Sequence, residues 1–126
     1  MSQTLDQKRA AFAWECAKTG MQQQGKEYKT LAKGAPALIM NSGLMATLAF
    51  YNHKGSAARK LLDDLIRGLS SRLAGQTLQP GQGVTIFGPF MKDVLQQSES
   101  REYLRYTDEA LEILKWIRQF VDAVDA

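Results

Sequence analysis

The sequence is poor in cysteine and histidine, with one of each in 126 residues. The single cysteine, Cys16, cannot form an internal disulfide, and its place on the apolar face of a predicted helix favours a packed side chain over a reactive thiol. The single histidine, His53, has no second histidine and no cysteine pair near it. These absences predict a protein without a metal site, a cofactor or a catalytic histidine pair, and we expect no enzymatic activity.

Long hydrophobic runs are also absent. The longest unbroken apolar run is far shorter than the roughly 20 residues that a membrane span needs. The first residues, Met-Ser-Gln-Thr-Leu-Asp, lack the basic and apolar regions of a signal peptide. A hydrophobic content of 44% is sufficient for one core in a chain of this length. We therefore expect a single cytoplasmic domain that spans residues 1–126 and does not bind a membrane.

Two segments, 36–50 and 103–120, are too apolar to be ordinary surface helices. Pro36 suits the first position of a helix, because its φ is already helical and no amide donor is wasted. Since few polar residues follow it, the helix from Pro36 is predicted to lie at the centre of the domain. The second segment carries a broad apolar stripe, in which Trp116 and Phe120 are expected to be largely buried.

Capping, glycine and proline signals divide the chain into helices joined by short breaks. Thr4 and Gln7 form a capping-box pattern, Gly20 and Gly34 are predicted helix stops, and Ser56 is a candidate N-cap. The predicted helices span about 4–19, 26–33, 36–51, 56–73 and 89–97, with a long last helix capped by Ser98 or Ser100. The glycine-rich stretch between 75 and 88 predicts the main loop, with 84–87 as a short extended piece. The fold class is therefore all-α, a compact bundle of five or six helices.

Gly43 falls inside the predicted helix 36–51, where glycine costs about 0.5 to 1 kcal/mol relative to alanine. Two explanations are open. A neighbouring helix approaches closely at this position, or the backbone there contacts a ligand or partner.

The charges are distributed unevenly along the chain. Residues 1–75 contain eleven Lys and Arg against five Asp and Glu, whereas residues 76–126 contain five against eight. Within the basic part, Lys26, Lys29 and Lys33 recur at i, i+3 and i+7, so they share one helix face and are expected to be unpaired. They are candidate phosphate contacts, followed by Lys54 and Arg59 at the turn into the fourth helix. A solvated helix face is the alternative.

Other charges predict ordinary surface ion pairs. Lys60 with Asp64, and Asp63 with Arg67, are i, i+4 pairs typical of a solvated helix face. On the last helix we expect exposed carboxylates to pair with nearby cations: Asp108, Glu109 and Glu112 with Arg105 and Lys115. Neither set indicates a metal site.

Several motifs follow one another in an order that resembles a known family. They are Pro36-x-apolar-apolar, Gly43-Leu44, Leu48-Ala49-Phe50, Lys54-Gly55, Tyr103-Leu-Arg-x-Thr-x-Glu-x-Leu and Trp116-x-Arg118-x-Phe120. In this order the chain resembles the small subunit of the type III-B CRISPR RNA-targeting (Cmr) effector complex. One departure is Ser42 before Gly43, where family members often carry Asn.

The resemblance implies a non-catalytic subunit that stacks along the complex and holds target RNA beside the guide RNA. The implied partners are guide and target RNA, the large subunit, the helical backbone subunits and neighbouring copies of the same chain. The RNA-binding candidates are Lys26, Lys29, Lys33, Lys54 and Arg59. Two alternatives stay open: a helical protein-protein adaptor without RNA contact, and an unrecognised nuclease.

Overall fold

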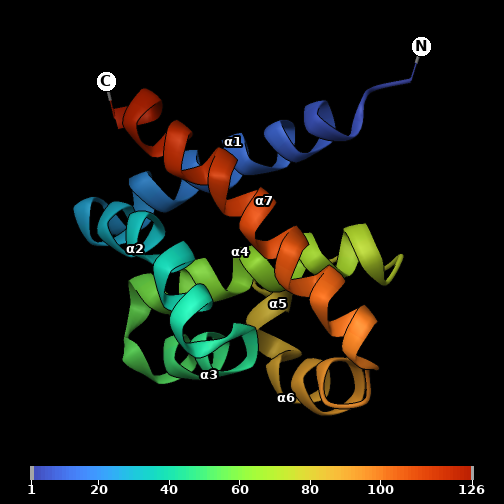
Figure 1. The fold of residues 1–126 in the computed structure, drawn as a ribbon. Coiled ribbons are helices and arrows are strands. Elements are labelled where there is room, and N and C mark those ends of the chain that lie inside the picture. Colours follow the sequence, from blue (N-terminus) through green and yellow to red (C-terminus); the bar gives the residue numbers. More distant parts are fainter. Residues whose placement is uncertain (1, 126) are drawn as a thin grey trace.

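The computed structural model describes residues 2–125, and every regular element among them is a helix (Figure 1). The elements are α1 (Leu5–Gln24), α2 (Lys26–Ser42), α3 (Leu44–Lys54), α4 (Ser56–Leu73), α5 (Gln82–Thr85), α6 (Phe87–Pro89), the π-helix η1 (Phe90–Leu95) and α7 (Ser100–Asp125). The predicted all-α class is confirmed. There are more elements than the predicted five or six, because the region between α4 and α7 forms three short helical pieces. None of the helices described is both long enough and apolar enough for a membrane span.

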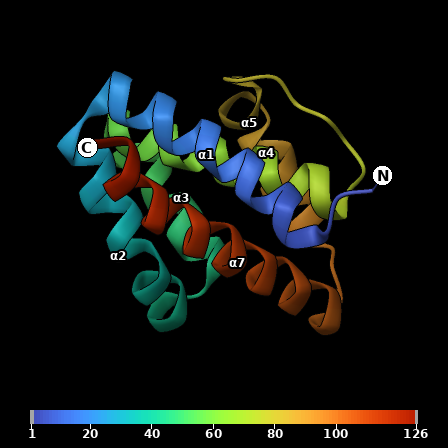
Figure 2. The same ribbon diagram turned by 90° about the horizontal axis from the view of Figure 1, so that it is seen from above.

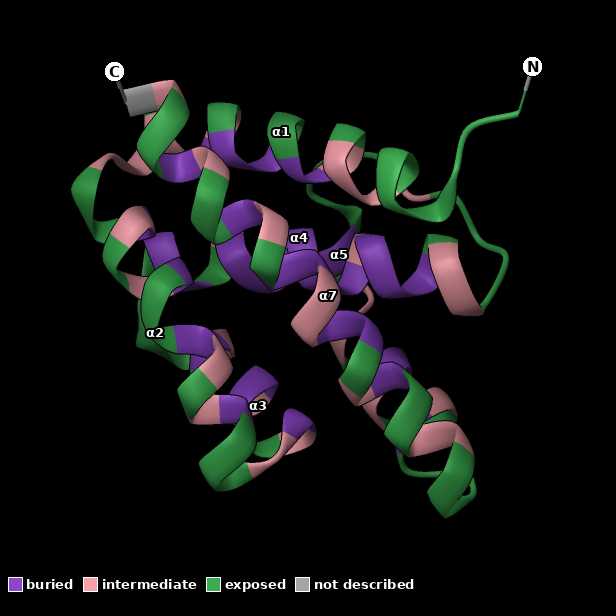
Figure 3. Cartoon of the chain, turned by 45° about the horizontal axis from the view of Figure 1, so that its top comes forward, coloured by how far each residue is buried: buried purple, intermediate pink, exposed green. Residues whose placement is uncertain are grey.

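Helix α4 lies at the centre of the bundle and contacts α1, α2, α3, α5 and α7. Most of its residues are buried, as the purple ribbon of Figure 3 shows. The prediction that the segment from Pro36 would be central is wrong. That segment is divided between α2 and α3, each of which buries only one face and leaves Met40 76% and Phe50 40% exposed.

Helices α1 and α7 pack against each other, and the last turns of α7 lie beside α1 and α2 (Figures 1 and 2). The buried stripe of α7 consists of Tyr106, Glu109, Ala110, Ile113, Leu114, Ile117 and Val121. Trp116 and Phe120 are largely, though not fully, buried against the core, as predicted. They lie at the edge of this stripe, where Phe120 contacts Trp14 of α1 as well as Trp116.

Two predicted helix stops are wrong. Gly20 lies inside α1, where an added Cβ would come within 2.5 Å of the Tyr28 ring. This glycine therefore permits close packing between α1 and α2 and does not end a helix. Helix α2 runs through both Gly34 and Pro36, so Pro36 is an internal residue without an amide donor.

Gly43 separates α2 from α3, so its predicted place inside one helix is also wrong. Its φ is 89°, a conformation that glycine adopts far more easily than other residues. A Cβ here would have only one neighbour within 4 Å, the Tyr103 hydroxyl at 3.8 Å. The backbone conformation, and not close helix packing, accounts for this glycine.

The predicted loop is confirmed for residues 75–81, but the chain after it forms α5 and α6, because Asp63 organises the start of α5. The Asp63 carboxylate accepts hydrogen bonds from the amides of Gly81 and Val84, at 3.0 and 2.9 Å. These amides open α5, so a side chain of α4 caps a helix 18 residues later. The predicted extended piece 84–87 is therefore wrong.

The expected helix ends near 56 and 89–100 are corrected in detail. Helix α4 begins at Ser56 itself, after Gly55, so Ser56 is not the N-cap. The predicted helix 89–97 corresponds to the π-helix η1. Its i to i+5 hydrogen-bond pattern continues at its end, where the amide of Gln96 donates to the carbonyl of Met91. Helix α7 begins at Ser100, and the carbonyl of Glu99 accepts its first amide bond.

Ionisation of the buried Tyr51 should lower the stability of the fold at alkaline pH. Burial raises the pKa of Tyr51 to about 12, whereas the unfolded chain ionises it near 10. The unfolded state therefore loses its proton first, and the free energy of unfolding should fall as the pH rises from 10 through 12. We expect Tyr51→Phe to reduce this fall in denaturant titrations at about pH 9 to 11. An identical pH dependence in both proteins would contradict the assignment.

Candidate nucleic-acid interface

Three of the predicted RNA-binding residues lie together. Lys26, Lys29 and Lys33 are on one face of α2, as their spacing predicts, and they line a shallow hollow of about 390 Å³. We call this site the lysine hollow; its other lining residues are Met21, Gly25 and Thr30. Lys26 and Lys33 are exposed and Lys29 is half-buried. The hollow is therefore an open, basic depression at the junction of α1 and α2.

Lys29 and Lys33 are paired with a carboxylate, which corrects the expectation from sequence for these two lysines. Lys33 Nζ donates to Asp122 Oδ2 at 2.8 Å, and Lys29 Nζ lies 3.1 Å from Asp122 Oδ1. The hydrogen bonds from Lys33 and Lys29 hold the pKa of the Asp122 carboxyl below its usual value. Asp122 belongs to α7, 89 residues after Lys33, so local spacing gives no signal of this contact.

Lys54 and Arg59 lie apart from the lysine hollow, at the junction of α3 and α4. The Lys54 ammonium lies 5.3 Å from the centre of the Phe50 ring. Arg59 donates from Nη1 to the carbonyl and to Oδ1 of Asn52, at 2.8 and 2.9 Å. Both cations are exposed, but the structure does not bring them together with the three lysines.

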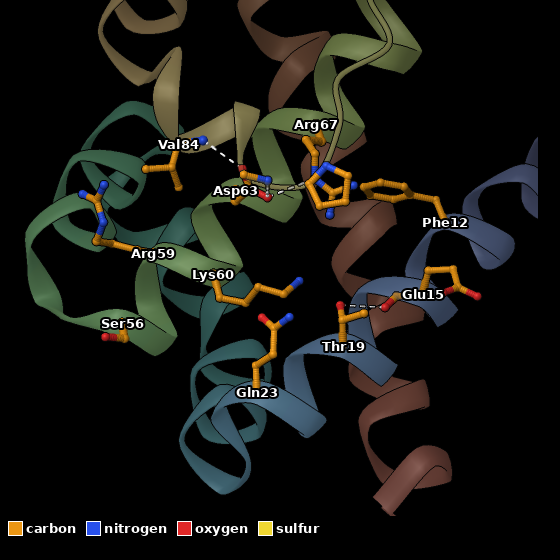
Figure 4. Close-up of a pocket in the computed structure, with 12 residues that line it drawn as sticks. Phe12, Glu15, Thr19, Gln23, Ser56, Arg59, Lys60, Asp63, Arg67 and Val84 are labelled. Atoms are coloured by element: carbon orange, nitrogen blue, oxygen red, sulfur yellow. Dashed lines mark hydrogen bonds and ion pairs between the residues drawn. The ribbon is translucent and has the colours of Figure 1, made fainter.

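A larger cleft of about 720 Å³ lies between α1, α4 and the chain that leads into α5 (Figure 4). It is lined by Phe12, Glu15, Thr19, Gln23, Ser56, Arg59, Lys60, Asp63, Arg67, Pro80, Gly81 and Val84. Figure 4 shows the side chain of Arg59 extending away from the middle of this cleft. Lys60 and Arg67 both bind carboxylates there, so the cleft offers little uncompensated positive charge.

These carboxylates are part of a buried polar network, and the expected solvated face is wrong. Asp64 is fully buried and accepts hydrogen bonds from Tyr28 Oη at 2.7 Å, from Arg67 Nη2 at 2.9 Å and from Lys60 Nζ. Burial raises the pKa of Tyr28 well above its usual value. The sequence did carry a signal of this burial, because the two adjacent carboxylates lie inside the apolar run from Leu61 to Ile66.

Glu109 is buried as well, although it was expected on an exposed face. Its carboxylate accepts two hydrogen bonds from Arg9, from Nε at 2.8 Å and from Nη2 at 2.7 Å. This bidentate pair joins α1 to α7, and Arg72 of α4 approaches the same carboxylate at 4.0 Å. Glu109 follows Tyr106 by three residues and precedes Ile113 by four, so the apolar stripe itself indicated burial.

The remaining reactive side chains do not converge on a site in the described part of the chain. Cys16 is buried, as predicted, and burial raises the pKa of its thiol well above the usual value. His53 is exposed, with its ring 5.8 Å from that of Phe50. Glu112 lies 3.7 Å from Lys115, as expected from their spacing.

Comparisons with known proteins agree on one family. Residues 5–124 match the family described as CRISPR-associated protein (Cas_Cmr5). A curated relative, the CRISPR system Cmr subunit Cmr5 of Thermus thermophilus, is 28% identical over 123 residues, which cover 96% of each chain. The crystal structure of a CRISPR-associated Cmr5 family protein, also from Thermus thermophilus, superimposes with a TM-score of 0.73. It is 25% identical, and the match covers 99% of this chain and 100% of the other.

Proposed function

The chain belongs to the Cmr5 family of CRISPR-associated proteins, and we propose that it is the non-catalytic small subunit of a type III-B RNA-targeting complex. In this role a single helical domain contacts guide and target RNA through a basic face. Other faces contact the large subunit, the helical backbone subunits and neighbouring copies of the chain. Such a complex works in the cytoplasm, where guide and target RNA are found.

The observation that carries the RNA contact is the lysine hollow. Three ammonium groups reach one open depression, and the Asp122 carboxylate lies between Lys29 and Lys33. The phosphates of a nucleic acid strand are the natural ligands for such a group of cations, because each contact releases condensed counterions. A phosphate can take the position of Asp122, since both present anionic oxygens to the same ammonium groups.

The state of the other reactive groups supports a non-catalytic role. Glu109 is held by Arg9, and Asp63 and Asp64 are held by Lys60 and Arg67. These carboxylates are buried, at 5% exposure or less, and stabilise contacts within and between helices. The ring of His53 lies beside the ring of Phe50. Phe50 is apolar, so it cannot exchange a proton with the histidine.

A protein-protein adaptor without RNA contact is the alternative. It is favoured by two exposed apolar side chains, Met40 at 76% and Leu104 at 58%. Isolated exposed apolar residues are common on protein surfaces, however, and give little weight to a partner by themselves. The two functions differ in one property, the salt-dependent binding of RNA.

Substitution of Asp122 tests the proposed RNA contact without disturbing the core, because its side chain is 54% exposed. Binding of a labelled single-stranded oligoribonucleotide would be followed by fluorescence anisotropy at several salt concentrations. We expect the RNA affinity of the wild-type chain to fall as the salt concentration rises. At low salt, Asp122→Asn should bind RNA about threefold more tightly than the wild type. This factor corresponds to removing one charge about 6 Å from a phosphate in water, about 0.7 kcal/mol.

Asp108→Asn is the matched control, since it removes the same charge from an exposed position elsewhere on α7. The control should leave the affinity nearly unchanged. Equal effects of both substitutions would indicate that only net charge matters. Absence of RNA binding by the wild-type chain, alone and in a reconstituted complex, would favour the protein-protein adaptor.

A further inference from the structure

An exposed tryptophan lies on the same face of α1 as the approach to the lysine hollow. Trp14 is 40% exposed, which is unusual for a side chain of this size in a small protein. Trp14, Lys18, Met21 and Gly25 follow one another at i, i+4, i+7 and i+11, so they share one face of the helix. Met21 and Gly25 line the lysine hollow, which places Trp14 and Lys18 on a strip that leads away from it.

The position of the Trp14 ring is fixed by α7. The ring of Phe120 contacts it edge to face, with centres 5.2 Å apart and an angle of 79° between the planes. Phe120 in turn packs on Trp116, with ring centres 5.8 Å apart. Two residues after Phe120, Asp122 binds the lysines of the hollow. The same turns of α7 therefore border both the aromatic and the basic part of the strip.

The dimensions of the strip suit a nucleic acid strand. Trp14 and Met21 are seven positions apart on the helix, a distance of about 10 Å along the axis. This is about three times the roughly 3.4 Å rise of one nucleotide in a stacked strand. A strand whose phosphates lie in the lysine hollow can thus place a base over Trp14 within a few nucleotides.

We propose that Trp14 is a base-stacking platform, and that the lysine hollow together with Trp14 and Lys18 binds single-stranded RNA in preference to duplex. Bases stacked inside a duplex cannot lie on an indole, whereas unpaired bases stack on aromatic side chains with little regard for sequence. The inference rests on the proposed RNA contact and extends it to the form of RNA that the site accepts.

The charges beside Trp14 favour a strand of RNA over an apolar protein surface as its ligand. Lys18 is exposed on the same face, and the lysine hollow follows directly. The neighbouring acid, Glu15, lines the cleft on the α4 side. An apolar partner that covered Trp14 would also cover Lys18, at a cost in desolvation that RNA phosphates do not impose.

The test compares two substitutions of Trp14 in the full chain. Trp14→Leu keeps an apolar side chain but removes the ring, and Trp14→Phe keeps a ring. Their affinities would be measured for a single-stranded oligoribonucleotide of about 12 nucleotides, a length within the range of single-strand binding sites. We expect Trp14→Leu to weaken binding about tenfold without changing the slope of affinity against salt, and Trp14→Phe to retain most of the affinity. Duplex RNA of the same length should bind both variants and wild type equally.

An abasic strand of the same length is the internal control, because it offers phosphates but no bases. Wild type and Trp14→Leu should bind the abasic strand equally. If Trp14→Leu instead lost the same affinity for the abasic strand as for the base-containing strand, Trp14 would only shape the hollow, and the inference would be overturned. So would unchanged binding of the base-containing strand by Trp14→Leu, or loss of this variant from a reconstituted complex with RNA affinity intact. If substitution of the three lysines also leaves RNA binding unchanged, the proposed RNA contact itself fails. If the lysines matter and Trp14 does not, only the stacking inference fails.

Discussion

Asp64→Ala is expected to lower the free energy of unfolding by about 3 to 5 kcal/mol, the range for removing one partner of a buried ion pair. Asp64 is fully buried and is the common acceptor for Tyr28, Lys60 and Arg67. Its removal leaves two cations of α4 facing a cavity, and leaves the Tyr28 hydroxyl without its acceptor. Since small domains are stable by only about 5 to 15 kcal/mol, this loss would remove a large part of the total stability.

Equilibrium denaturation in urea, followed by circular dichroism, measures this loss. Asp108→Ala is the control, because Asp108 is an exposed carboxylate of α7, and surface substitutions usually stay within about 0.5 kcal/mol. A loss below about 1 kcal/mol for Asp64→Ala would show that the network contributes little. The same network makes Lys60 and Arg67 unsuitable as controls in RNA-binding experiments, since their substitution would disturb the core.

The sequence predicted the helical class because apolar periodicity is a local property of the chain. The helices predicted for 56–73 and across 103–120 are present as α4 and α7. The helix ends were less predictable, because a glycine can serve three different purposes. Gly20 admits the Tyr28 ring, Gly34 lies in an uninterrupted helix, and Gly43 separates two helices. Sequence alone does not distinguish these cases, since they depend on what packs against the glycine.

Helix caps supplied by distant elements could not be predicted from the sequence either. Asp63 of α4 accepts hydrogen bonds from the amide of Gly81, which precedes α5, and from that of Val84 inside it. The Tyr103 hydroxyl of α7 accepts a hydrogen bond from the amide of Met45 at the start of α3. Neither helix start carries a local capping residue. Signals for such starts lie 18 and 58 residues away along the chain.

For the candidate site, too, the features set by local spacing were predictable and those set by distant contacts were not. The spacing of Lys26, Lys29 and Lys33 was sufficient to place them on one face, because a helix fixes that geometry. Their partner Asp122 comes from α7, and its contact depends on the packing of the whole bundle. Charge counting along the sequence therefore overestimated the free positive charge of this face.

Changing Lys26, Lys29 and Lys33 together to alanine is expected to flatten the slope of log affinity for RNA against log salt by about 2 units. Each phosphate neutralised on a single strand contributes about 0.7 to this slope, and the three ammonium groups reach one hollow. Between about 50 and 200 mM salt, a difference of about 2 units corresponds to about a 16-fold change in relative affinity. The effect should not depend on the sequence of the RNA, because phosphates carry no base information.

The control for this variant removes the same charge elsewhere, by substituting Lys8, Lys92 and Lys115, which are all exposed and lie outside the lysine hollow. A slope that flattens equally in both triple variants would indicate attraction by net charge alone. An unchanged slope in the Lys26, Lys29 and Lys33 variant, with its unfolding curve intact, would reduce the hollow to a solvated face. In that case Lys54 and Arg59, at the separate junction of α3 and α4, would be the next positions to substitute. If they too left the slope unchanged, the protein-protein adaptor would be the better account of this chain, because no predicted phosphate contact would then affect RNA binding.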